Sequence, residues 1–95
     1  MTSPWPRGWF GIDDPEHKRL FAEELESEVG AGHPLKGMTA IPIARADGRD
    51  DYLFQLPEER VAEVHLTFAN RPERPPWPAT ALFDNLEARR KATEE

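Results

Sequence analysis

Residues 39–68 read TAIPIARADGRDDYLFQLPEERVAEVHLTF and contain three short runs in which apolar side chains recur at every second position. The runs cover residues 39–46, 51–56 and 61–68. Alternation with a period of two predicts β-strands. An Asp-Gly pair at 47–48 marks a turn after the first run, and residues 57–60 mark a second turn. Such short connections predict an antiparallel meander with the second strand in the centre.

One face of each strand is predicted to point into the core. The inward set is Ile41 and Ile43 in the first strand, Tyr52, Phe54 and Leu56 in the second, and Ala62, Val64, Leu66 and Phe68 in the third. His65 lies between two inward residues, so its side chain is expected on the opposite face. Pro42 has no backbone N–H to donate, which predicts that the first strand is an edge strand or carries a bulge.

A helix is predicted before the strands. Residues 13–16 (DDPE) combine an aspartate cap, proline at the first helical position and an acid in the first turn. Gly30 and Gly32 end the helix after Val29. Its apolar stripe consists of Phe21, Ala22, Leu25 and Val29. A three-stranded sheet with an exposed apolar face is not stable alone, so this helix is expected to cover the inward face.

The C-terminal half of this helix is acidic. It contains Glu23, Glu24, Glu26 and Glu28. The helix dipole favours cations at that end, and compensation by Lys36, by Arg45, by a basic partner or by solvent alone stays open. A metal site formed by His17, Glu24 and Glu28 is disfavoured, because the first two are separated by about 10 Å along the helix axis.

The remaining segments complete a single α+β domain over residues 1–95 with a folded core at 13–90. The flanking parts are an irregular aromatic arm at 1–12, a linker at 30–38, an extended proline-rich loop at 69–78, a short helix from a cap at Thr80 to Arg90, and a frayed tail at 91–95. The predicted fold is therefore an N-terminal helix on a three-stranded antiparallel meander, followed by a loop and a short C-terminal helix.

Charge and composition argue against several classes of function. The chain carries 12 basic and 18 acidic side chains, a net charge of −6, which repels nucleic acid and anionic membrane surfaces. Cysteine is absent, which excludes disulfides, thiolate metal sites and cysteine nucleophiles. No apolar run is long enough for a signal peptide or a membrane span, so we expect an acidic cytoplasmic protein. No cofactor or metal motif is present.

Three ionisable residues are candidates for catalysis. His65 titrates near neutral pH and is a candidate general base, with His33 or Asp51 to orient it. Each residue also has a structural alternative. His65 can be a half-exposed strand histidine, His33 a histidine in a glycine-rich turn, and Asp51 a turn aspartate that accepts backbone hydrogen bonds. No nucleophile motif accompanies them, so a small hydrolase ranks second among the possible functions.

The favoured function is a protein-interaction or regulatory module. Trp77 in the proline-rich loop and His65 on the open sheet face are candidate contacts for a partner protein. Arg71 and Arg74 contribute basic groups for an acidic partner. The preferred alternative is that these two arginines, with Arg89 and Arg90, balance the acidic helix within the molecule.

Five short segments follow one another along the middle of the chain: GHPLKG at 32–37, IAR at 43–45, DDYLF at 50–54, VHLTF at 64–68 and PWPAT at 76–80. Together they resemble a family of small bacterial proteins of uncharacterised function. The residues that the resemblance places in a recurring pattern are His33, Asp51, His65 and Trp77. It implies no mechanism. The chain differs from the pattern at Phe68, where tryptophan is expected, and at 57–60, where a glycine-containing turn is expected.

Overall fold

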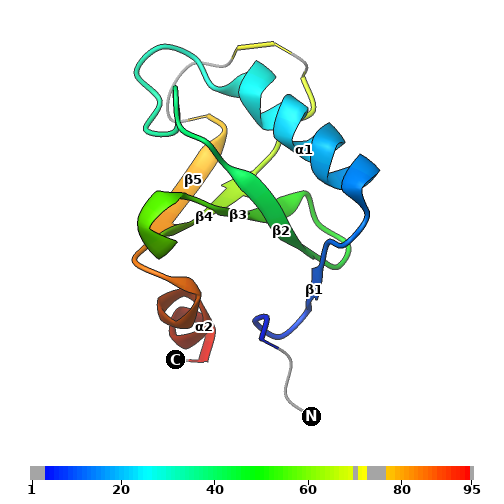
Figure 1. Ribbon diagram of the computed structural model, residues 1–95, viewed down its shortest axis with the longest axis vertical. Helices are drawn as coiled ribbons and strands as arrows, with labels where there is room; N and C mark the ends of the chain where they lie inside the picture. Colours follow the sequence, from blue (N-terminus) through cyan, green and yellow to red (C-terminus); the bar gives the residue numbers. More distant parts are fainter. Residues whose placement is uncertain (1–3, 70, 73–76, 95) are drawn as a thin grey trace.

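The computed structural model describes residues 4–69, 71–72 and 77–94 (Figure 1). The elements are β1 (Trp9–Gly11), α1 (Pro15–Glu28), β2 (Ile41–Ala46), β3 (Asp51–Gln55), the 3-10 turn η1 (Pro57–Glu59), β4 (Val61–His65), β5 (Ala79–Phe83) and α2 (Leu86–Glu94). Figure 1 shows α1 lying along one side of the sheet and α2 at the other end of the molecule, next to β5. None of the helices in the described ranges has the length and apolar character needed to cross a bilayer.

The sheet has five antiparallel strands in the order β1-β2-β3-β4-β5. The predicted meander forms its centre, but the prediction of three strands is wrong. The two additional strands lie at the edges, in segments expected to be an irregular arm and the start of a helix. β1 is only three residues long, too short to show a periodic pattern in the sequence.

The C-terminal helix begins later than predicted. Thr80 belongs to β5, and the side chain of Asn85 accepts a hydrogen bond from the Ala88 N–H at 2.8 Å, which is the geometry of a helix N-cap. α2 therefore starts at Leu86, and it continues to Glu94 through the residues expected to fray. Much of the predicted proline-rich loop, at 70 and 73–76, lies outside the described residues.

The prediction that Ile41 and Ile43 point beneath the helix is wrong. Ile41 is half-exposed, whereas Pro42 and Ala44 are buried. The pairing of β2 with β3 shifts register between Pro42 and Ala44, so Ile43 sits in an irregularity. The predicted bulge near Pro42 is therefore confirmed, and the bulge changes which residues of β2 face the helix.

The sheet is buried on both faces. Beneath α1, Leu25 and Val29 pack on a cluster that includes Tyr52, Phe54, Leu56, Ala62, Val64 and Leu66. The opposite face carries a second cluster of Trp9, Ala44, Ala46, Leu53 and Val61, covered in part by Trp5, Ile43 and Leu86. The aromatic arm and α2 thus cover a face that the sequence analysis left open, and burial on both faces removes the simple alternation from β3.

Glu28 is fully buried, although it belongs to the acidic half of α1. Its Oε1 accepts a hydrogen bond from the Thr67 N–H at 2.9 Å, and its Oε2 accepts one from the Phe68 N–H at 2.8 Å. The charge of this carboxylate is therefore compensated by two backbone N–H donors beyond the end of β4, and not by Lys36 or by solvent. Phe68 was expected in the core, but it is 42% exposed and its φ is +58°.

The turn at η1 also departs from ordinary backbone geometry. Glu58 and Glu59 have φ values of +63° and +67°, in the left-handed region that favours glycine. The chain therefore keeps a conformation suited to glycine while placing two glutamates in it.

Candidate functional site

His65 forms the centre of the candidate site. It is the last residue of β4, and its direct cross-strand partner in β3 is Asp51. The Nδ1 atom of His65 lies 2.7 Å from Oδ1 of Asp51. The His65 side chain is 50% exposed, while that of Asp51 is only 17% exposed. The strand register thus builds a histidine–aspartate pair whose carboxylate is sheltered and whose imidazole reaches solvent.

A second contact fixes the carboxylate. Nε of Arg49 lies 3.4 Å from the other oxygen, Oδ2, of Asp51. Because Asp51 bonds to Nδ1, the Nε2 atom of His65 is the ring nitrogen available to a ligand. In chemical terms the pair provides an oriented imidazole able to accept or donate one hydrogen bond, or to move one proton.

The pair borders a shallow hollow of about 310 Å³. Its lining residues are Asp51, Glu63, His65, Ala79, Thr80 and Ala81. Glu63 is ion-paired with Arg89 of α2, and the Arg89 guanidinium stacks over Trp9 at 5.5 Å from the ring centroid. The hollow therefore has a polar wall formed by β3 and β4 and a small, apolar wall formed by β5.

His33 is not among the residues that line this hollow, and it is held by structural contacts. It is buried, its Nδ1 accepts a hydrogen bond from the Leu35 N–H at 3.0 Å, and its Nε2 lies 3.0 Å from the Pro78 carbonyl oxygen. Nε2 is also 3.2 Å from the Thr80 hydroxyl. Both ring nitrogens of His33 are thus occupied in joining the linker after α1 to the start of β5.

The two histidines belong to opposite faces of the sheet. Thr80, which contacts His33, is the direct partner of Val64, and Val64 packs beneath α1. His65 is the next residue along β4, so its side chain projects from the other face. The structure brings His65 together with Asp51 and leaves His33 outside the pair. Among the described residues, no three His, Cys, Asp or Glu side chains are placed to hold a metal ion.

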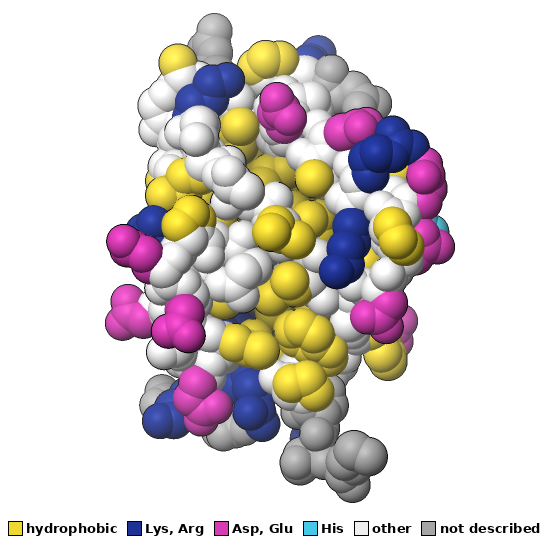
Figure 2. Space-filling model, in the orientation of Figure 1, with side chains coloured by type: hydrophobic (Ala, Val, Ile, Leu, Met, Phe, Trp, Pro, Cys, Tyr) yellow, Lys and Arg dark blue, Asp and Glu magenta, His cyan; other side chains and the backbone are white. Residues whose placement is uncertain are grey.

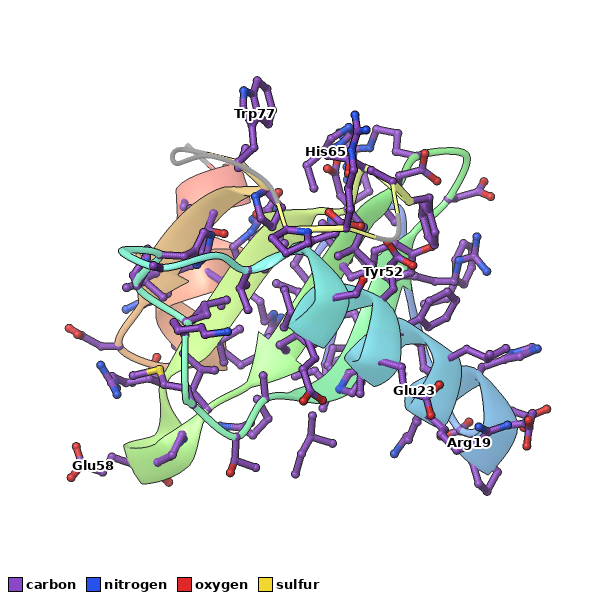
Figure 3. All side chains as sticks on the ribbon, turned by 90° about the horizontal axis from the view of Figure 1, so that it is seen from above. Arg19, Glu23, Tyr52, Glu58, His65 and Trp77 are labelled. Carbon is purple, nitrogen blue, oxygen red and sulfur yellow. The ribbon has the colours of Figure 1, made fainter. Side chains whose placement is uncertain are left out.

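The remaining sequence-predicted binding residues lie near β5 or after β4. Trp77 is two residues before β5 and half-exposed, and Figure 3 shows it standing clear of the molecule on the same side as His65. Arg71 is exposed. Arg74 falls outside the described residues.

β5, the strand beside the hollow, was not expected from the sequence. Its sequence, ATALF, has no charge and no proline. Within the described part of the chain, the β5 backbone hydrogen-bonds to β4 and to no other segment. Alanine and leucine favour helices, and Thr80 resembles a helix cap, so local sequence preferences pointed to a helix.

Comparison of the chain with protein-family models, with curated proteins and with solved structures gives no match.

Proposed function

We propose that this chain is a small protein-interaction module that binds an extended segment of a partner protein along the free edge of β5. The observation that carries the proposal is the uncharged, proline-free sequence of β5 at the end of the sheet. Exposed strand edges are usually protected by charges, proline or a bulge, because their free backbone groups pair with other chains. An edge without these features is suited to adding a strand.

The surroundings of β5 supply side-chain contacts for such a segment. Five residues of extended chain cover about 17 Å. Leu82, which is 46% exposed, lies on the α1 side of the strand, while Ala79 and Ala81 line the hollow on the other side. Trp77 is a candidate anchor just before the strand, because tryptophan commonly dominates binding energy at interfaces.

The His65–Asp51 pair gives the proposed site its selectivity. Side chains of an added strand alternate between the two faces, so every second side chain of the partner reaches the hollow. A polar side chain of the partner in the hollow would hydrogen-bond Nε2 of His65. The adjacent side chains of the partner would contact Leu82 on the other face of the sheet. The expected partner segment therefore alternates apolar and polar residues. We further propose a cytoplasmic location, since the domain lacks cysteine and needs no oxidising compartment.

The test is a selection of displayed short peptides on the purified protein, followed by an N-methyl scan of the best binder. Strand addition uses every second backbone N–H of the peptide. Methylation should therefore abolish binding at alternate positions and spare the positions between them. Uniform tolerance of methylation would contradict strand addition.

A matched pair of substitutions locates the binding site on the protein. Leu82→Lys places a charge beside β5, whereas Leu20→Lys makes the same change on α1 at a side chain that is 49% exposed. The first should weaken the selected peptide and the second should not. Equal affinities for the two variants would place binding elsewhere.

A hydrolase is the second candidate, and the 2.7 Å contact between His65 and Asp51 favours it. It ranks second because the one hydroxyl among the hollow's lining residues, that of Thr80, is engaged with the Pro78 carbonyl. An activated ester such as p-nitrophenyl acetate tests it. Turnover that His65→Ala removes and His17→Ala keeps would support an enzyme, and identical rates in both variants would exclude this role for His65.

A further inference from the structure

A second surface with binding chemistry lies around Arg45, toward the β1 edge of the sheet and away from β5. The Arg45 guanidinium lies 5.8 Å from the ring centroids of both Phe21 and Tyr52, which are 4.4 Å apart. Phe68 meets Tyr52 edge-on at 6.2 Å. Residues of α1, β2 and β3 therefore meet at this arginine, and the chain after β4 adds Phe68 through its contact with Tyr52. We call these four residues, with Phe10, the Arg45 surface.

Phe10 extends this surface across the sheet edge. It is the direct cross-strand partner of Arg45, so the two side chains share a face. Phe10 is 56% exposed, the highest value among the large exposed hydrophobic side chains of the described residues. The Arg45 surface thus includes two exposed rings, Phe10 as the cross-strand neighbour of Arg45 and Phe68 as the ring that contacts Tyr52.

Arg45 has no acidic partner within the described residues. Arg19, Arg49 and Arg89 each form an ion pair with a carboxylate. Arg45 is exposed and forms no such pair. Its guanidinium is instead positioned by cation–π contacts with Phe21 and Tyr52, and no hydrogen bond between described residues uses its N–H donors.

The backbone at Phe68 is held in an unfavourable conformation that keeps the ring on the surface. A φ of +58° is rare for a bulky side chain. The buried Glu28 carboxylate fixes this geometry by accepting the N–H groups of Thr67 and Phe68. Strained residues tend to occur at binding sites, and here the strain positions an exposed aromatic ring beside Tyr52.

We propose that the Arg45 surface binds an acidic side chain of a partner peptide, with the carboxylate on the Arg45 guanidinium and flanking apolar residues on Phe10 and Phe68. A carboxylate matches the planar, forked donor set of arginine. A single acidic residue fits better than a polyanion, since the chain's net charge of −6 repels dense negative charge. This site is independent of β5, and either can fail without the other.

The probe is an array of fluorescein-labelled peptides with one central Asp or Glu between Phe or Leu residues, paired with identical peptides carrying Asn or Gln. Fluorescence polarisation should show that acidic peptides bind about tenfold or more tightly than their amide partners. Arg45→Gln should lower the affinity of the acidic peptides to that of the amides, while the amides change little. Arg45→Lys should give an intermediate affinity, because lysine keeps the positive charge but lacks the paired N–H donors of the planar guanidinium.

Matched variants and outcomes complete the test. Arg19→Gln removes an arginine of α1 whose side chain is 56% exposed, and it should leave binding unchanged. Phe68→Ala should weaken acidic and amide peptides alike. Equal binding of both arrays, no effect of Arg45→Gln, or no binding at millimolar peptide would each overturn the proposal. Tighter binding of a short oligonucleotide through Arg45 would also overturn it.

Discussion

The Glu28 carboxylate illustrates how one residue joins distant parts of this chain. It is completely buried and accepts hydrogen bonds from two backbone N–H groups 39 and 40 residues away. Glu28→Gln replaces one accepting oxygen with an NH2 group that faces an N–H donor. We expect the free energy of unfolding to fall by about 1.5–3 kcal/mol, the usual contribution of hydrogen bonds to a charged group, as measured by urea denaturation.

The control for this prediction is Glu26→Gln, an exposed residue two positions earlier in α1. Surface changes of this kind alter stability by no more than about 0.5 kcal/mol. Equal losses of stability in the two variants would contradict the role assigned to Glu28.

Tyr52 is the single tyrosine of the chain, so its ionisation can be followed directly by ultraviolet absorbance. Burial raises the pKa of Tyr52 above its ordinary value of 10.0, while the Arg45 guanidinium lowers this pKa and the Asp50 carboxylate raises it. We expect a titration midpoint above 10.0. Arg45→Gln should move the midpoint up and Asp50→Asn should move it down. Movement of both variants in one direction would contradict the arrangement of charges around the ring.

The same shift links stability to pH. The pKa of Tyr52 is higher in the folded protein than in the unfolded chain, so the folded state binds the phenol proton more tightly. This contribution to stability is complete below the unfolded pKa of about 10 and is lost as the pH rises through the folded-state pKa. Tyr52→Phe should remove this part of the alkaline loss of stability in urea titrations.

At the scale of elements, β1 connects the N-terminal arm to the second core cluster. Trp9 is buried against Ala44, Ala46, Leu53 and Val61. Trp9→Ala should lower the free energy of unfolding by about 3–5 kcal/mol, as is usual for removing a buried aromatic side chain. Phe10→Ala, in the same strand but exposed, should change stability little. A small effect of Trp9→Ala would show that the arm does not stabilise the sheet.

The turn at η1 carries avoidable strain. Left-handed backbone costs a residue with a side chain about 1–2 kcal/mol, and glycine avoids this cost while losing more chain entropy on folding. Since Glu59 has a φ of +67°, Glu59→Gly should raise the free energy of unfolding by about 0.5–1 kcal/mol. The contrasting variant, Glu26→Gly within α1, should lower it by about 1 kcal/mol. A loss of stability in both variants would contradict the left-handed geometry of the turn.

For the whole molecule, the two core clusters lie on opposite faces of shared strands. Tyr52 and Leu53 are neighbours in β3, yet the first packs beneath α1 and the second against Trp9. Loss of either cluster therefore exposes the other, which predicts a single cooperative domain. Thermal unfolding followed by far-ultraviolet circular dichroism and by tryptophan fluorescence should give coincident transitions. Separate midpoints would show two units and contradict the single domain expected from the sequence.

Local patterns in the sequence predicted the centre of this fold well. The period-two runs located β2, β3 and β4, and the DDPE start signal located α1, where the Asp14 side chain accepts a hydrogen bond from the Glu16 N–H. The expected position of His65 on the face away from α1 agrees with the register of β4 and β5. These features depend on residues within a few positions of one another, so periodicity and capping preferences encode them.

Tertiary structure alone decided the rest. β1 and β5 become strands because a neighbouring strand pairs with them, and the bulge in β2 reverses the faces expected for its isoleucines. The burial of Glu28 and the meeting of His65 with Asp51 join residues that are far apart in sequence. Such contacts depend on how the chain crosses itself and not on local conformational preference, so a single sequence carries no periodic signal for them.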